Sequence, residues 1–118
     1  MITITATVSA HSLMLGSTSS TMQVLPTGSF GIDRISFSIS GTDWTSATTV
    51  KAQFWRDDSS EIYEVTVTNN LAIIPKEVLK TTGKLYIALY GITGSTKRIS
   101  TNAVCIEIEQ GSRYTEIS

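Results

Sequence analysis

The residue types that perform catalysis or bind metal ions are scarce in this sequence of 118 residues. His11 is the single histidine and Cys105 the single cysteine, so a His- or Cys-built metal site and a Ser-His-Asp triad both lack their usual members. We interpret His11 as an ordinary strand-end or loop residue. Cys105 alternates with Val104 and Ile106, which favours a structural thiol in a strand over a nucleophile.

Paired carboxylates are the next candidates, because such pairs hydrolyse glycosides or hold calcium. Asp57 and Asp58 form a turn doublet, and Glu107 and Glu109 share one face of an expected strand. A sugar hydrolase needs a long cleft, and Asp-rich loops with alternating ligands are missing. We interpret both pairs as solvated, with calcium at Asp57 and Asp58 as the alternative.

A glycine-containing segment, GITGSTKR over 91–98, shares residue types with a phosphate-binding loop. Its spacing differs from that motif and no helix follows, so we expect a hairpin turn, with its Lys-Arg pair at a solvated loop edge. Taken with the scarcity of reactive residues, this predicts a protein that is not an enzyme. We expect no catalytic residue, no cofactor and no metal.

Aromatic residues are the remaining candidates, because they can line a protein interface or a carbohydrate platform. Three of them stand in expected strands opposite the aliphatic residues: Trp55, Tyr86 and Tyr90. We select these three as the candidate protein-contact residues. A sugar platform and plain packing remain as alternatives, and Trp44 and Tyr63 belong to the same wider aromatic set.

Composition restricts the partners further. Hydrophobic residues make up 41% of the chain and charged residues only 16%, with a net charge of −1. This balance leaves no excess of positive charge with which to bind the phosphates of nucleic acid. No apolar run approaches the ~20 residues that span a bilayer. The first sixteen residues lack the basic start and unbroken apolar stretch of a signal peptide. We therefore expect no nucleic acid, no membrane insertion and folding in a cytoplasm.

Alternation of apolar and polar residues predicts short strands along the whole chain. We expect seven or eight, and turn signals between them are typical of an all-β sandwich or barrel. The clearest strands cover 2–9, 35–40, 50–55, 62–68, 85–90 and 104–109, with a shorter one ending at Pro26. We expect a single domain over 1–111, followed by a tail or linker over 112–118.

The connections between these strands also give specific expectations. One short helical turn is predicted near 76–81, where Val78 and Leu79 would pin it to the core. Segment 40–48 is expected to be a loop that carries Trp44, and segment 56–61 a hairpin turn. The strand over 62–68 ends at an Asn-Asn pair at 69–70, residues that can accept positive φ.

One part of the sequence resembles a known family. The order IPKEVL, a glycine, KLYIALYG and then KRIST is similar to the immunoglobulin-like N-terminal module of baseplate upper proteins. Related tail and head-fibre proteins of phages and prophages of Gram-positive hosts share this module. The matching residues are Ile74, Pro75, Glu77 to Leu79, Gly83, Leu85 to Gly91, Arg98 and Thr101.

The resemblance implies an immunoglobulin-like β-sandwich that works as an adaptor in a virion. Such a module would be made in the bacterial cytoplasm and would bind other virion proteins and itself, as a homo-oligomer. It would act by protein–protein contact in a tail, baseplate or fibre. The alternative is a carbohydrate-binding β-sandwich that recognises a glycan on the host surface.

Overall fold

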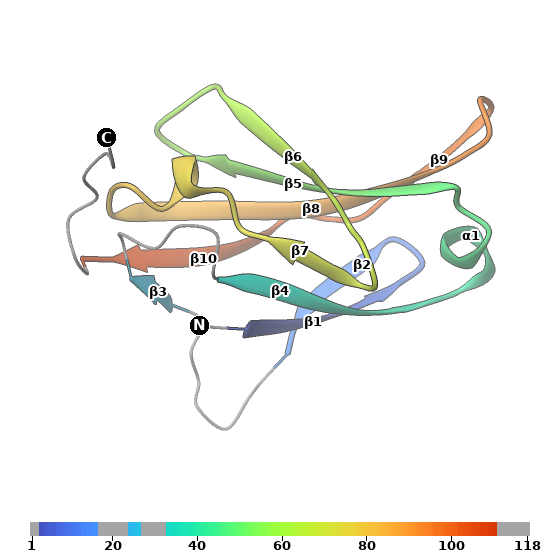
Figure 1. Cartoon of the computed structure of the whole chain (residues 1–118), viewed down its shortest axis with the longest axis horizontal. Coiled ribbons are helices and arrows are strands. Elements are labelled where there is room, and N and C mark those ends of the chain that lie inside the picture. The colour runs from blue at the N-terminus through green and yellow to red at the C-terminus, as the bar shows by residue number, and fades with distance from the viewer. Residues whose placement is uncertain (1–2, 17–23, 27–32, 111–118) are drawn as a thin grey trace.

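A computed structural model describes residues 3–16, 24–26 and 33–110. Within these ranges the chain forms ten strands, one short α-helix and one 3-10 turn. The strands build two packed sheets, so the expected all-β sandwich is confirmed, with more strands than the seven or eight expected. Most strands run along the long axis of the molecule (Figure 1). The expected tail or linker at 112–118 lies outside the described residues.

The smaller sheet has four strands, and we call it the four-stranded sheet. Its two central strands, β1 and β4, run parallel to each other, while the outer pairs are antiparallel. In spatial order its strands are β2 (Ser12–Leu15), β1 (Thr3–Ser9), β4 (Arg34–Ser40) and β7 (Leu71–Ile73).

The larger sheet has six strands, and we call it the six-stranded sheet. Only its first pair, β3 with β10, is parallel among the pairings that the described residues make in this sheet. In order, its strands are β3 (Val24–Pro26), β10 (Val104–Glu109), β8 (Gly83–Thr93), β5 (Thr49–Arg56) and β6 (Ile62–Thr66), while β9 (Lys97–Ser100) pairs with β8.

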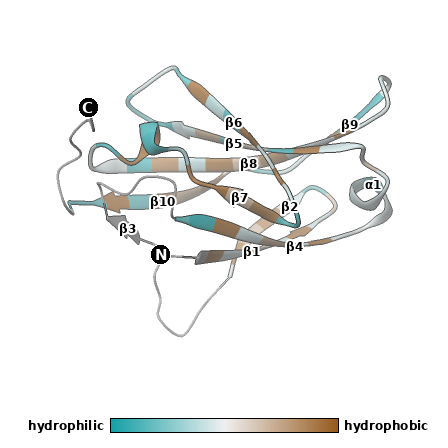
Figure 2. Ribbon diagram, viewed as in Figure 1, coloured by the Kyte–Doolittle hydropathy of each residue, from teal (hydrophilic) through white to brown (hydrophobic). Residues whose placement is uncertain are grey.

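Every second residue of β1, β8 and β10 is buried between the two sheets, as the alternation predicts. Figure 2 shows hydrophobic and polar residues alternating along the strands. Segment 91–98 differs from its prediction, because β8 continues to Thr93 and β9 begins at Lys97. The hairpin turn is therefore shorter than expected, and its Lys-Arg pair lies in a strand. The core includes Ile4, Val8, Ile35, Phe37, Phe54, Ile74, Leu85, Ile87, Leu89, Ile106 and Ile108.

A tight turn carries the chain from one sheet to the other. Asn69 and Asn70 have φ of 53° and 62°, a conformation that asparagine accepts, and lie between Thr68 and Leu71. These two flanking residues exchange both backbone hydrogen bonds at 3.0 Å. Positive φ at both central positions matches the right-handed twist of the flanking strands. The turn thereby connects β6 of the larger sheet to β7 of the smaller one.

One end of the sandwich is closed by the 3-10 helix η1 (Lys76–Val78). It is shorter than the turn expected over 76–81, because Leu79 already leaves helical geometry with φ −108° and ψ 10°. Val78 and Leu79 are completely buried, as predicted. This segment therefore plugs the space between the two sheets where their strands end.

The opposite end is closed by a helix that the sequence did not reveal. Segment 40–48 was predicted to be a loop, yet Thr42–Thr45 forms the short helix α1 and buries Trp44. The indole Nε1 donates to the Ala10 carbonyl at 2.8 Å. A Cβ at Gly91 would lie 3.2 Å from the indole ring, so the glycine makes room for it. Figure 1 shows α1 and η1 at opposite ends of the long axis.

Candidate functional site

The outer face of the six-stranded sheet carries the three predicted contact residues. Trp55, Tyr86 and Tyr90 are each half-buried and lie opposite the core, as the alternation predicted. Trp55 and Tyr86 are direct neighbours on β5 and β8, with ring centroids 5.9 Å apart and ring planes at 17°. Tyr90 lies four residues further along β8. The sheet therefore brings two of the three rings together and separates the third.

An apolar row crosses this face at the level of the stacked rings. Trp55 pairs with Ile62 on one side and with Tyr86 on the other, and Tyr86 pairs with Cys105. Ile62 is 58% exposed although it is aliphatic, and Cys105 is exposed. We call these four residues the apolar row. It spans four adjacent strands and ends at Ile62 on β6.

A network of polar side chains lies beside the apolar row, on the side away from η1. Gln53 donates from Nε2 to Glu64 Oε2 at 2.9 Å, and the Tyr90 hydroxyl donates to Glu64 Oε1 at 3.0 Å. The Arg98 guanidinium lies over the Tyr90 ring, 4.2 Å from its centroid, in a cation–π contact. Lys51 Nζ donates to a neighbouring threonine hydroxyl at 2.8 Å. The network fixes the side chains on this half of the face.

The network also shifts two pKa values. The hydrogen bond from Gln53, with help from Tyr90, Lys51 and Arg98, holds the pKa of Glu64 below its ordinary value. Desolvation, followed by the hydrogen bond to the Glu64 carboxylate, raises the pKa of the Tyr90 phenol. Both shifts favour the charge states that make the bond, an ionised carboxylate and a neutral phenol.

Sequence reasoning missed the partners of Tyr90 because they come from other strands. Glu64 lies within the strand expected over 62–68, but Arg98 was assigned to a turn. The register that brings them to Tyr90 depends on which strands pair, which alternation within one strand does not specify. The one available signal was that Lys97 to Ser100 itself alternates around the buried Ile99.

Three further residues considered from the sequence lie in the core, in the apolar row and on the inner side of β6. Trp44 belonged to the wider aromatic set, but it is 3% exposed and therefore unavailable to a partner. Cys105, interpreted as a structural thiol, is exposed at one end of the apolar row. Tyr63 packs from the inner side of β6 against the core.

A polar hollow of about 390 Å³ lies between the β1–β2 turn, α1 and the β8–β9 hairpin. His11 was interpreted as a strand-end or loop residue, and it lies in the first of these turns. Its Nδ1 is 2.9 Å from the Ser100 carbonyl. Because a carbonyl only accepts, Nδ1 carries the proton and donates it. The hollow is lined by His11, Asp43, Ser46, Thr93, Thr96, Lys97, Arg98 and Ile99.

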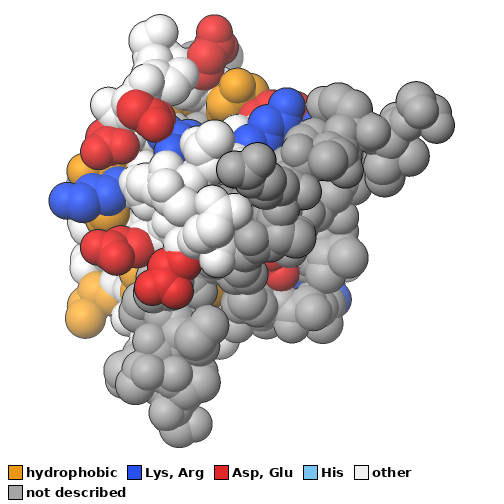
Figure 3. Space-filling view, turned by 90° about the vertical axis from the view of Figure 1, so that its left-hand side faces the viewer, with side chains coloured by type: hydrophobic (Ala, Val, Ile, Leu, Met, Phe, Trp, Pro, Cys, Tyr) orange, Lys and Arg blue, Asp and Glu red, His pale blue; other side chains and the backbone are white. Residues whose placement is uncertain are grey.

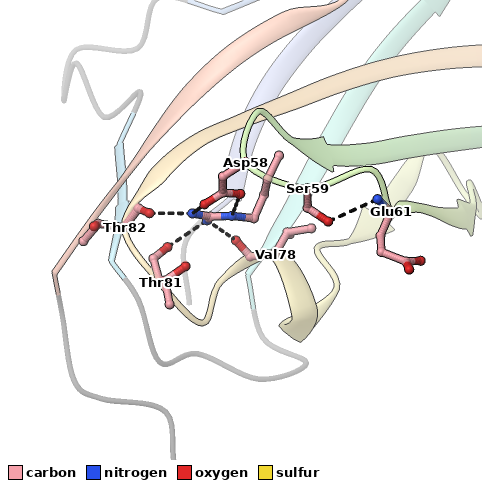
Figure 4. Close-up of polar contacts among 7 residues, drawn as sticks. Asp58, Ser59, Glu61, Val78, Thr81 and Thr82 are labelled. Carbon is pink, nitrogen blue, oxygen red and sulfur yellow. Dashed lines mark hydrogen bonds and ion pairs between the residues drawn. The ribbon is translucent and has the colours of Figure 1, made fainter.

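Arg56 was expected to begin the 56–61 turn, but it is the last residue of β5 and its side chain is buried beside that turn. Arg56 is 7% exposed and donates to the carbonyls of Val78, Thr81 and Thr82 (Figure 4). Its Nε and Nη2 also donate to both oxygens of Asp58 at 3.0 Å. This fork holds the segment after η1 against the end of β5, and its hydrogen bond keeps the pKa of Asp58 below the ordinary value.

The Arg56 fork bears on the calcium alternative at Asp57 and Asp58. Both oxygens of Asp58 already accept from Arg56, which leaves Asp57 as the free member of the doublet. Within the described ranges, no group of three or more His, Cys, Asp and Glu residues is placed to hold a metal ion.

No protein-family model matches this chain, and no curated protein matches it either. In the part of the chain that the structure describes, no helix has the length and apolar character needed to cross a membrane.

Proposed function

We propose that this chain is a non-enzymatic structural module of a phage or prophage virion. In this proposal it attaches a tail, baseplate or fibre component to the particle by protein–protein contact. The observation that carries it is the Trp55–Tyr86 stack within the apolar row. Half-exposed aromatic side chains on a rigid sheet are typical anchors of protein interfaces. We assign the contact to this face.

The strand order supports the immunoglobulin-like part of the proposal. β5, β8 and β10 lie side by side as strands C, F and G do in immunoglobulin sandwiches, and β6 extends this sheet beside β5 as C′ does. β4 and β7 are neighbours in the other sheet, as B and E are. The parallel pairing of β1 with β4 departs from that pattern.

Particle incorporation tests the proposal directly. Epitope-tagged chain is expressed in a producer strain, and virions purified on density gradients are probed for the tag. We expect the chain to co-sediment with particles and Trp55→Ser/Tyr86→Ser to reduce its incorporation at least about tenfold. The matched control is Thr7→Ala/Ser38→Ala, a neighbouring pair exposed on the four-stranded sheet. Absence of wild-type chain from particles would refute the virion role.

A carbohydrate-binding role is the second candidate, and the same aromatic pair favours it. Nearly parallel rings suit stacking against a sugar, and Gln53 and Glu64 supply hydrogen-bonding groups in the adjacent row. Titration with host cell-wall oligosaccharides is then expected to change the Trp55 fluorescence, with Trp55→Phe as the control. Unchanged emission across the series would remove this candidate.

A further inference from the structure

The outer face of the six-stranded sheet has opposite net charges on the two sides of the apolar row. One side of the apolar row lies toward η1. The charged residues on this side are two carboxylates and one ammonium on β10 and β8, so the net charge is −1: Glu107, Glu109 and Lys84. On the opposite side stand Lys51, Arg98 and Glu64, two cations and one carboxylate, with a net charge of +1. All six lie on the same face as the aromatic rings.

The acidic side of the apolar row continues into the end of the molecule. Acidic side chains gather there (Figure 3). They include the exposed Asp57, Asp58 and Glu61 of the β5–β6 turn. The opposite end carries the β8–β9 hairpin with Lys97 and Arg98. The charge asymmetry therefore runs along the strands, with the uncharged apolar row between its two halves.

We propose that this face binds a second copy of the chain, face to face, around a twofold axis that runs along the apolar row. This inference rests on the proposed protein-contact role of the same face. The axis places each aromatic pair over its equivalent in the partner. It also turns the acidic side of each copy onto the basic side of the other. The interface is isologous, the commonest form in homodimers.

The rows give one specific charge pair. The Arg98 guanidinium lies over Tyr90, four residues from the apolar row on one side. Glu109 lies four residues from Cys105 on the other side. Rotation about the row brings Arg98 to the level of the partner's Glu109. By the same operation the partner's Lys84 comes to the level of Glu64, but β8 and β6 are two strands apart in the sheet, so these two charges do not face each other directly.

Charge decides between the two possible in-plane axes. A twofold axis parallel to the strands leaves each residue at the same level along the strand, so basic rows face basic rows and acidic rows face acidic rows. The axis across the strands instead brings Arg98 of each copy opposite the partner's Glu109. It also keeps the strands of the two sheets aligned, one of the two packings that stacked sheets adopt. Complementary potentials of this kind set the register of an interface.

The area suits a weak dimer. Four strands spaced about 4.8 Å apart, over rows from Glu109 to Tyr90, cover on the order of 500 Å² per copy. The total of about 1,000 Å² lies at the lower bound for specific interfaces. Dimerisation in the micromolar range is therefore expected.

Sedimentation velocity of the full chain tests the dimer. The mass is measured from about 1 to 500 μM and is expected to rise from 12.8 kDa to twice that value. Trp55→Ser/Tyr86→Ser is expected to weaken association at least about tenfold, while Thr7→Ala/Ser38→Ala leaves it unchanged. A monomer at every concentration, or a trimer, overturns the proposal. Circular dichroism and thermal unfolding verify that each variant is folded.

Charge reversal tests the axis. Arg98→Glu and Glu109→Lys are each expected to weaken the dimer about tenfold, because each places two like charges in contact in both copies. Combining them recreates an opposite-charge pair and is expected to restore the dissociation constant to within about threefold. If the double variant is as weak as the single ones, the axis is wrong.

Cys105 provides an independent measure of the same geometry. In the proposed dimer it faces the partner's Cys105 across the axis, with backbones about 10 Å apart as in stacked sheets. This is too far for a disulfide but within reach of a short bismaleimide. We expect cross-linked dimer from the wild type and none from Thr7→Cys/Cys105→Ser. The reverse result places the contact on the four-stranded sheet and overturns the proposal.

The particle assay separates this inference from the proposed function. If the chain is monomeric and Trp55→Ser/Tyr86→Ser still loses incorporation, the face contacts a different virion protein and the dimer is overturned. If the chain dimerises through the row but is absent from particles, the dimer holds and the virion role fails.

Discussion

Arg56 is the residue on which closure of the η1 end depends. Its guanidinium supplies donors to three carbonyls of the segment 78–82, which has no strand partner of its own there. Lysine keeps the charge but not the planar fork that reaches several acceptors at once. A buried guanidinium is therefore used here as a backbone-binding group, with Asp58 as its partially exposed counter-charge.

Replacing Arg56 by Met is expected to lower the free energy of unfolding by about 2–4 kcal/mol, because three carbonyls lose their donor. Arg56→Lys is expected to cost about 1–2 kcal/mol. Urea denaturation at pH 7 measures both. Asp58→Asn is the matched control and is expected to cost less than either, since its partner keeps the three carbonyl bonds. Equal losses from Asp58→Asn and Arg56→Met would contradict this account.

The raised pKa of Tyr90 predicts how the stability of the fold depends on pH. Desolvation and the Glu64 carboxylate raise its pKa, so the folded protein holds the phenol proton more tightly than the unfolded chain does. This contribution to stability is present below the unfolded pKa of about 10 and is lost as pH rises through the folded value. Absorbance at 295 nm is expected to show one tyrosine titrating late.

The control for this titration is Glu64→Gln, which removes the charge but retains an acceptor. The late phase is expected to move back toward the ordinary value only in part, because desolvation is the larger cause. Tyr90→Phe is expected to remove the phase. A late phase that survives Tyr90→Phe would assign the shift to another tyrosine.

At the scale of elements, the start of β8 depends on a glycine. Gly83 has φ of 142°, a region that L-residues rarely adopt, and a Cβ there would lie 2.5 Å from Arg56 Nη2. Gly94, in the β8–β9 turn, has φ of 60° and open space where its Cβ would stand. A side chain at Gly83 would suffer both backbone strain and a steric clash, whereas a side chain at Gly94 would suffer backbone strain only. Comparing the two positions therefore isolates the cost of the clash.

Gly83→Ala is expected to lower the free energy of unfolding by at least about 2 kcal/mol, because strain and collision act together. Gly94→Ala is expected to cost about 1 kcal/mol, the ordinary penalty of a left-handed residue. Thermal and urea unfolding of the two variants measure the difference. A smaller loss at Gly83 than at Gly94 would show that Arg56 moves aside without cost.

The strands that alternation predicted best are those with one face in the core. Strands β1, β4, β5, β6, β8 and β10 were predicted from sequence, and so were the outward positions of Trp55, Tyr86 and Tyr90. Strands β2 and β9 and helix α1 were missed, because four residues are too few for a period to emerge. The burial of Trp44 depends on Gly91 and Ala10, which are distant in sequence.

Across the whole molecule, pairing is the information that the sequence did not reveal. The parallel contacts of β1 with β4 and of β3 with β10 join segments that alternation treats independently. The same applies to the candidate site. The sequence predicted the three aromatic residues, but it did not predict the apolar row or the charged residues beside it. Those features exist only once β6, β5, β8 and β10 are aligned in register.

The segments that close the two ends of the sandwich, η1 with Arg56 and α1 with Trp44, pack against the same core. They lie at opposite ends of a molecule 42 Å long. We therefore expect them to contribute independently to one cooperative unfolding transition. Trp44→Phe removes the hydrogen bond to Ala10 and part of a buried ring, which is expected to cost about 1–2 kcal/mol. Arg56→Lys at the other end is expected to cost a similar amount.

For sites this far apart with no shared partners, the double variant is expected to lose the sum of the two single losses to within about 0.5 kcal/mol. The sum remains below the 5–15 kcal/mol typical of a domain, so the double variant stays folded. Urea unfolding followed by tryptophan fluorescence and by circular dichroism measures both the losses and the coincidence of the transitions. A coupling above about 1 kcal/mol, or two separate transitions, would mean that the ends close on different parts of the core.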